Sequence, residues 1–129
     1  MAKYFTPGEF SCRCGCGLSK LDPDLIQILD KGREYFGRPI IITSGTRCER
    51  HNAAIGGAVH SAHLVGDDGW SHAVDIKIIS GQTCWELFHI FCALGIVRFE
   101  VSNKHLHIDN SKSIYHPQKI LIGTYLKEV

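Results

Sequence analysis

The sequence has no apolar run that approaches the roughly 20 residues needed to cross a bilayer, although 44% of its 129 residues are hydrophobic. Its N-terminus, MAKYFTPGEFSC, lacks an apolar core followed by a small-residue cleavage site, so we expect synthesis in the cytoplasm without a secretory signal. The net charge of +1 gives no broad electrostatic reason for binding to nucleic acid or to an anionic membrane. We therefore expect no membrane insertion and no nucleic-acid partner.

Internal repeats, linkers and low-complexity segments are missing as well, so nothing in the sequence divides the chain into parts. A chain of 129 residues has the size of one domain and can bury about two thirds of its unfolded surface. We expect a single domain over residues 1–129 and a monomer.

Two segments carry clear helix signals. Asp22 is an N-cap acceptor in front of a proline, and apolar residues then keep helical spacing, which predicts a helix over residues 23–36 that ends at a glycine. Thr83 and Glu86 have the spacing of a capping box, which predicts a second helix over residues 83–94. A short polar helix over "CERHNAA" would be the third.

The remaining apolar and alternating segments predict strands. They cover residues 38–43, 72–79, 96–101, 105–109 and 118–126. Helices and strands do not alternate regularly, so the predicted class is α+β, with a small, mainly antiparallel sheet and two to three helices packed on it.

Six cysteines are present, and three of them cluster in "CRCGCG" at residues 12–16. A structural zinc site usually has two Cys-x2–4-Cys pairs, and the second pair is missing here. A disulfide to Cys48 is an alternative, although the absent signal peptide favours reduced thiols. Cys84 and Cys92 fall in the apolar helical segment, where we expect ordinary buried thiols.

Histidines and acidic residues are concentrated where the predicted strands lie. In "KHLHID", His105, His107 and Asp109 alternate, so a strand would point all three side chains to one face. Asp75 interrupts the apolar strand "HAVDIKII", where a carboxylate is costly unless it is paired or holds a metal. Neighbouring strands would place Asp75 and His107 about 5 Å apart. With His63 from the preceding loop, they would form the two-histidine, one-carboxylate set of a hydrolytic zinc site.

The order of the motifs resembles peptidase family M15, the zinc D-Ala-D-Ala carboxypeptidases and murein endopeptidases, in its small single-domain phage and bacterial type. That family has Ser-Gly-x-Arg, Ser-x-His-x-x-Gly, Ala-x-Asp and His-x-Asp in this order. Here the motifs are formed by Ser44, Gly45 and Arg47; by Ser61, His63 and Gly66; by Ala73 and Asp75; and by His107 and Asp109. The resemblance extends from about Phe10 to Asp109.

The resemblance implies a zinc-dependent metallopeptidase that binds one Zn2+ through His63, Asp75 and His107, on the face of the sheet. It also implies that Arg47 binds the substrate or polarises its carbonyl, that Ser61 binds the substrate as well, and that His105 assists catalysis. The expected substrate is a peptidoglycan stem peptide, cut at D-Ala-D-Ala or at L-Ala-D-Glu. The expected place of action is the cell wall, reached by the release of a phage lysin or by export.

Two features depart from the family pattern. His63 and Asp75 are twelve positions apart instead of seven, and the extra residues fit "DDGWS" at 67–71, which makes His72 a rival ligand. Lys104 occupies the position at which many members carry an acidic general base. The base must then be His105, Glu100 or Asp109. If none of them serves, the alternative is a catalytically inactive zinc-binding module of a phage or a cell-wall-binding protein.

Overall fold

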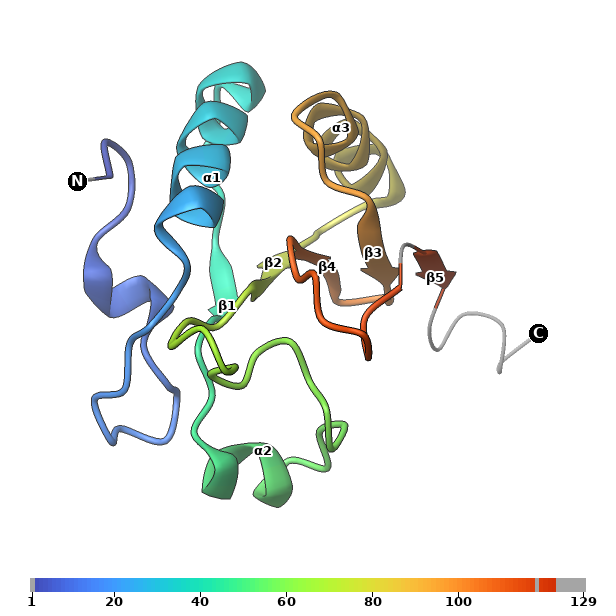
Figure 1. The fold of residues 1–129 in the computed structure, drawn as a ribbon. Helices are drawn as coiled ribbons and strands as arrows, with labels where there is room; N and C mark the ends of the chain where they lie inside the picture. Colours follow the sequence, from blue (N-terminus) through green and yellow to red (C-terminus); the bar gives the residue numbers. More distant parts are fainter. Residues whose placement is uncertain (1, 118, 123–129) are drawn as a thin grey trace.

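A computed structural model describes residues 2–117 and 119–122, which form a five-stranded sheet flanked by helices (Figure 1). The helices are η1 (Pro7–Phe10), α1 (Pro23–Phe36), α2 (Glu49–Ala54) and α3 (Gly81–Ala93). The strands are β1 (Ile42–Ser44), β2 (Ala73–Lys77), β3 (Arg98–Val101), β4 (His105–Asp109) and β5 (Lys119–Ile122). Among the described residues, no helix has the length and apolar character needed to cross a membrane.

The strand order is β1-β2-β4-β3-β5, and every neighbouring pair is antiparallel except β3 and β5. The predicted α+β class with a mainly antiparallel sheet is confirmed. The predicted last strand is present as β5, while residues 118 and 123–126 of that prediction lie outside the described residues.

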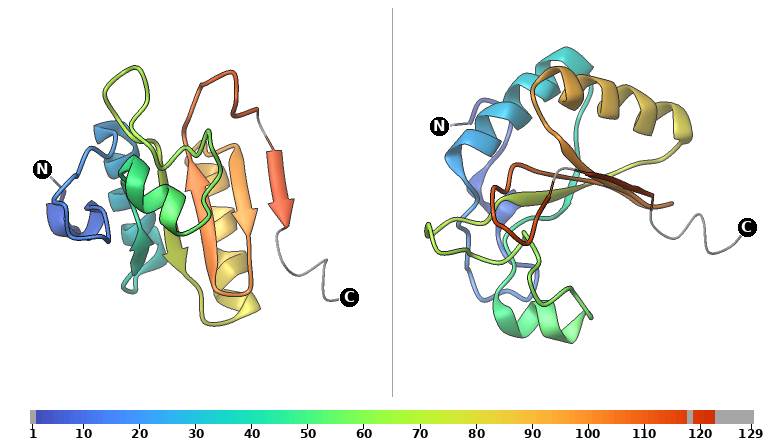
Figure 2. Two further views of the ribbon diagram at one scale, coloured as in Figure 1. Left: turned by 90° about the horizontal axis from the view of Figure 1, so that it is seen from below. Right: turned by 45° about the vertical axis from the view of Figure 1, so that its right-hand side comes forward.

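The two faces of the sheet have different roles. The helices α1 and α3 cover one face, and α2 with its adjoining loops lies on the other (Figure 2). The side chains of Val74, Ile76, Leu106, Ile108 and Phe99 are buried in the hydrophobic core. Because side chains alternate along a strand, the residues between them point to the opposite face, which therefore receives the polar residues of β2 and β4.

The first long helix forms as predicted. Asp22 Oδ1 accepts a hydrogen bond from the backbone N–H of Asp24 at 3.1 Å, and Gly37 ends α1 with a left-handed φ of 72°. Gly32 allows α1 to approach α3 closely, because an added Cβ would lie 2.5 Å from the ring of Phe91. This contact places both helices on the core face of the sheet.

The start of α3 and the length of β1 were predicted wrongly. Helix α3 begins at Gly81, because Ser80 is a better-placed cap whose Oγ accepts from the N–H of Thr83 at 3.1 Å. Glu86 forms an ion pair with Arg38. Strand β1 covers only Ile42–Ser44, where its pairing with β2 is irregular.

The helix over residues 49–54, strand β2 and the β3–β4 hairpin agree with the prediction within a few residues. The two cysteines of α3 do not. Cys84 is half-buried and Cys92 is exposed, so the expected burial of both thiols is wrong.

Candidate metal centre

Three side chains from separate segments meet on the polar face of the sheet. Asp75 in β2 is the register partner of His107 in β4, and His63 reaches them from the loop before β2. One potential ligand atom of each lies within 4.8 Å of the others. Asp75 Oδ1 is 3.3 Å from His63 Nε2 and 3.0 Å from His107 Nδ1. Both imidazoles therefore point one nitrogen at the same carboxylate oxygen.

The loop holds His63 in one tautomer. Its Nδ1 lies 2.7 Å from the carbonyl oxygen of Gly45, which can only accept, so Nδ1 carries the proton. The backbone N–H of His63 donates to Ser61 Oγ at 3.1 Å, and its carbonyl accepts from the N–H of Arg47 at 2.9 Å. Burial lowers the pKa of His63, so the ring is neutral and Nε2 presents a lone pair to Asp75.

A chain of charged groups orients His107. Its Nε2 lies 2.8 Å from Asp109 Oδ2, and Arg98 Nε donates to both carboxylate oxygens of Asp109 at 2.8 and 3.0 Å. Burial opposes the charged form of His107, but the carboxylates of Asp109 and Asp75 outweigh burial and raise its pKa to about 9. Without a cation, His107 would be an imidazolium between two carboxylates.

The donor set fits a divalent metal ion. Burial would raise the pKa of Asp75, yet the neighbouring imidazoles of His107 and His63 hold that pKa well below its ordinary value, so the carboxylate is ionised. Asp75 Oδ1 lies 3.0 Å from His107 Nδ1, and it also faces the lone pair of neutral His63 Nε2 at 3.3 Å, with no proton between those two atoms. A cation between them would bind both. Two imidazoles whose outer nitrogens are each held by an acceptor are the arrangement in which proteins bind zinc.

Arg47 and Ser61 lie beside this cluster. The Arg47 guanidinium donates to Ser44 Oγ and Asn52 Oδ1, both at 3.2 Å, and to Asp75 Oδ2 at 3.4 Å. The side chain of Arg47 is 13% exposed, so one edge of its guanidinium group can reach a bound molecule. Ser61 fixes the loop through its hydrogen bond from His63.

The open end of the cluster lies towards the start of β4. The exposed fraction of the side chains rises from 0% at Asp109 through 13% at His107 to 35% at His105. His105 Nε2 is 3.8 Å from Asp75 Oδ2, and Glu100 is the register partner of His107 on β3. Lys104 is exposed in the turn before β4. A molecule approaching the cluster would therefore meet His105 first.

The rival ligand His72 has other partners. Its Nε2 lies 2.6 Å from Asp68 Oδ2, and its Nδ1 lies 3.0 Å from Asn110 Oδ1. Of the inserted residues 67–71, the first four form an exposed turn, closed by a bond from the N–H of Gly66 to the carbonyl of Trp70, while Ser71 is fully buried. The insertion thus leaves His63, rather than His72, beside Asp75 and His107.

The sequence interpretation missed Arg98, Asn52 and the carbonyl of Gly45. Arg98 had a usable signal, because it stands two residues before Glu100 in the hairpin and so faces Asp109 once the register is known. The roles of Gly45 and Asn52 depend on how the loops pack, which no local pattern reports.

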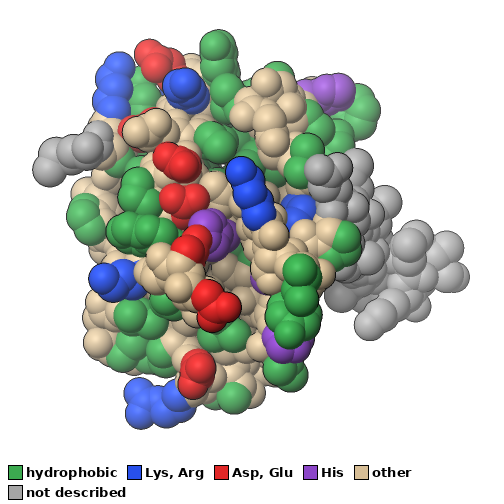
Figure 3. Space-filling view, in the orientation of Figure 1, with side chains coloured by type: hydrophobic (Ala, Val, Ile, Leu, Met, Phe, Trp, Pro, Cys, Tyr) green, Lys and Arg blue, Asp and Glu red, His purple; other side chains and the backbone are tan. Residues whose placement is uncertain are grey.

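A groove of about 1210 Å³ lies between residues 59–72 and 110–116, next to the start of α1. Its lining includes the carboxylates of Asp22, Asp24, Asp67 and Asp68, and Lys112 on the other wall. Acidic side chains follow a line down the middle of the face in Figure 3. None of the three cluster residues lines this groove, so it is a neighbouring feature rather than the cluster itself.

Comparison with known proteins gives one finding. A family model described as Peptidase M15 matches residues 3–109, which is most of the 129-residue chain and contains His63, Asp75 and His107. No curated protein matches the chain.

Proposed function

The chain belongs to the peptidase M15 family, and from that membership we propose that it is a zinc-dependent metallopeptidase acting on peptidoglycan stem peptides. In this proposal His63, Asp75 and His107 are the ligands of one Zn2+. The observation that carries it is the approach of His63 Nε2 to Asp75 Oδ1 at 3.3 Å, with a lone pair on each atom and no proton between them. Every other polar atom of the two imidazoles already has a partner that fixes the ring.

A zinc ion bound there would supply Lewis acidity, which polarises a scissile carbonyl and acidifies a water molecule. The chain's own residues would do the rest. Arg47 is held by Ser44, Asn52 and Asp75, so its guanidinium is oriented before a substrate arrives and can bind a carboxylate or carbonyl oxygen. Ser61 would keep the loop that carries His63 against the substrate.

His105 is our choice for the group that moves a proton. Its ring lies at the open end of the cluster, and its Nε2 is 3.8 Å from Asp75 Oδ2. Of the two other candidates, Asp109 has both oxygens engaged by Arg98 and His107 and is fully buried, so it is poorly suited to accept a proton from a substrate. Glu100 is exposed opposite His107 and is the second choice.

The bond cleaved would be D-Ala-D-Ala, as in a carboxypeptidase, or L-Ala-D-Glu, as in an endopeptidase. The protein would act as a monomer on the cell wall after release from the cytoplasm, in the manner of a phage lysin, or after export.

Digestion of purified peptidoglycan tests the proposal. Zinc-loaded protein should release peptides or D-alanine that mass spectrometry identifies, and the terminal residues of the products would reveal which bond is cut. The matched control is His107→Ala, which should release nothing above background. If the zinc-loaded wild type also releases nothing from murein of several cross-link types, the enzymatic proposal fails.

One observation favours a second function. Lys104 is a cation where many relatives carry an acidic base, and it is exposed in the turn beside His105. An inactive zinc-binding module of a phage or cell-wall protein would retain this site without turnover. Zinc binding and sedimentation with murein, in the absence of hydrolysis, would favour the module over the enzyme.

A further inference from the structure

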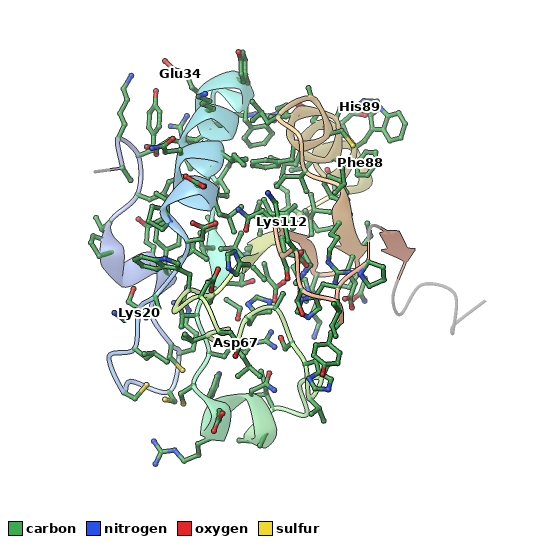
Figure 4. All side chains as sticks on the ribbon, viewed as in Figure 1. Lys20, Glu34, Asp67, Phe88, His89 and Lys112 are labelled. Carbon is green, nitrogen blue, oxygen red and sulfur yellow. The ribbon has the colours of Figure 1, made fainter. Side chains whose placement is uncertain are left out.

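Four cysteine side chains meet outside the candidate metal centre. Cys12, Cys14 and Cys16 come from the loop after η1, and Cys48 comes from the residue before α2. The four Sγ atoms all lie within 4.8 Å of one another. Sulfur atoms in yellow lie between the N-terminal loop and α2 in Figure 4. The fold therefore brings Cys48 to three cysteines that are at least 32 positions away in the sequence.

The separations of the sulfurs match a shared metal ion rather than disulfides. The Sγ of Cys12 is 3.5 Å from that of Cys14 and 3.8 Å from that of Cys48, and the Sγ atoms of Cys14 and Cys48 are 3.7 Å apart. Four thiolates bound tetrahedrally at a Zn–S distance of 2.3 Å would be about 3.8 Å apart. A disulfide needs about 2.05 Å, and all six cysteines are free.

Backbone geometry supports the convergence. Two glycines of "CRCGCG", Gly15 and Gly17, adopt left-handed φ values of 84° and 85°, which lets the chain fold tightly enough for alternate cysteines to face one point. Backbone N–H groups point at two of the sulfurs. Cys12 Sγ accepts from Cys48 at 3.4 Å, and Cys48 Sγ accepts from His51 at 3.3 Å. Such bonds stabilise thiolates, the form that binds a metal.

We propose that Cys12, Cys14, Cys16 and Cys48 bind a structural zinc ion that is separate from the candidate metal centre. Four converging sulfurs complete a tetrahedral shell and leave no open position, as in structural rather than catalytic zinc sites. The missing second Cys-x2–4-Cys pair is replaced by a third cysteine in the loop and one distant cysteine.

This site would hold the N-terminal loop against the segment that forms the candidate metal centre. Cys48 is next to Arg47, which contacts Asp75 at 3.4 Å. The same segment includes Gly45, whose carbonyl holds His63, and the N–H of Thr46 donates to the carbonyl of Phe10 at 2.9 Å. A zinc ion bound here would therefore fix the position of Arg47 without touching a substrate.

Zinc content measured on matched variants tests the proposal. His107→Ala removes a proposed ligand of the candidate metal centre and leaves the thiols intact. We expect two zinc ions per chain in the wild type, one in His107→Ala, and none in His107→Ala/Cys14→Ser/Cys48→Ser, each purified under reducing conditions and measured by mass spectrometry of metals. The control Cys84→Ser/Cys92→Ser changes two thiols of α3 and should keep both ions.

Cobalt substitution provides a readout that does not depend on the folding of the cysteine variants. Cobalt-loaded His107→Ala should show thiolate-to-cobalt charge-transfer bands and the strong visible bands of a tetrahedral site. The proposal is overturned if His107→Ala binds no metal, if its cobalt spectrum lacks the thiolate bands, or if intact mass reveals a disulfide among the four cysteines. A single zinc that disappears only with the cysteines would contradict the proposed catalytic centre and leave the thiol site standing.

Discussion

At the scale of single residues, the two imidazoles of the candidate metal centre are fixed by different acceptors. The carbonyl of Gly45 holds His63, and the carboxylate of Asp109 holds His107. A carboxylate raises the basicity of the ring it holds more than a neutral carbonyl does, so His107 should be the stronger of the two nitrogen ligands.

Replacing the carboxylate that holds His107 should weaken metal binding. We expect Asp109→Asn to lower zinc affinity by roughly 10–100-fold, because Asn keeps the shape but loses the charge paired with His107 and Arg98. Competition with a chromophoric chelator measures the affinity, and circular dichroism checks the fold. Asp67→Asn, at an exposed carboxylate, is the control. Equal affinity in the wild type and a folded Asp109→Asn would show that Asp109 does not support the metal.

Removing the imidazole at the open end should affect turnover rather than binding of zinc. We expect His105→Ala to keep its zinc and its fold and to lose hydrolysis by roughly a hundredfold or more, the usual contribution of a general acid or base. His89→Ala, at an exposed histidine of α3, should be unaffected. Near-native turnover in zinc-loaded His105→Ala would exclude this role, and Glu100→Gln would be the next variant to measure.

Sequence reasoning reached the ligand candidates but not the groups that hold them. Alternation in β4 predicted that His105, His107 and Asp109 share a face. The carboxylate in an apolar strand indicated Asp75, the loop before that strand offered His63, and the order of the motifs supported both. The contact of Arg98 with Asp109 needed the hairpin register, which depends on the length of the turn. Whether these five residues bind metal or act in catalysis stays a prediction.

At the scale of elements, the agreement follows the strength of local signals. Helix α1 has an N-cap, a proline and a terminal glycine that all indicate the same bounds, and it was predicted correctly. Helix α3 has two possible caps, and Ser80 prevailed over Thr83 because its hydroxyl accepts the bond from the first turn. Strand β1 is short because its pairing depends on β2, which no local pattern in 38–43 encodes.

The approach of the N-terminal segment to β1 can be tested at Gly45. A Cβ added there would lie 2.6 Å from the carbonyl oxygen of Phe10 and 2.8 Å from its Cα, both backbone atoms that cannot move aside. We expect Gly45→Ala to reduce the free energy of unfolding by about 1–3 kcal/mol. Gly8→Ala, where nothing lies within 4 Å, is the control. Urea denaturation compares the two, and equal stabilities would mean that the close contact is absent.

The contacts of His72 with Asp68 in the inserted turn and with Asn110 should stabilise the fold to a degree that depends on pH. Burial lowers the pKa of His72, but its bonds to Asp68 and Asn110 outweigh burial and raise that pKa. A pKa above the unfolded value of about 6.5 contributes stability that is complete below that pH and is lost as the pH rises through the folded value. The stability difference between the wild type and His72→Gln should therefore be largest below about pH 6.5 and should shrink as the pH rises above that value. A difference independent of pH would contradict the charged pair.

At the scale of the whole molecule, one face of the sheet forms the hydrophobic core and the other face bears the candidate metal centre. Its core face packs against α1 and α3, while the opposite face gathers residues from three distant segments. Composition and patterning predicted the α+β class, and the order of the motifs predicted the family. A contact of Cys48 with the N-terminal cysteines was raised only as an alternative, a disulfide. The convergence of all four thiols was not predicted, because it results from the packing of two loops.

In the proposed metal centre, His63, Asp75 and His107 bind one zinc ion together. Crystals of the zinc-loaded protein, measured with X-rays on both sides of the zinc absorption edge, test it most directly. We expect an anomalous peak between His63 Nε2, Asp75 Oδ1 and His107 Nδ1. A zinc-loaded crystal with no peak at that position, or with the peak between His72 and Asp68, would contradict it.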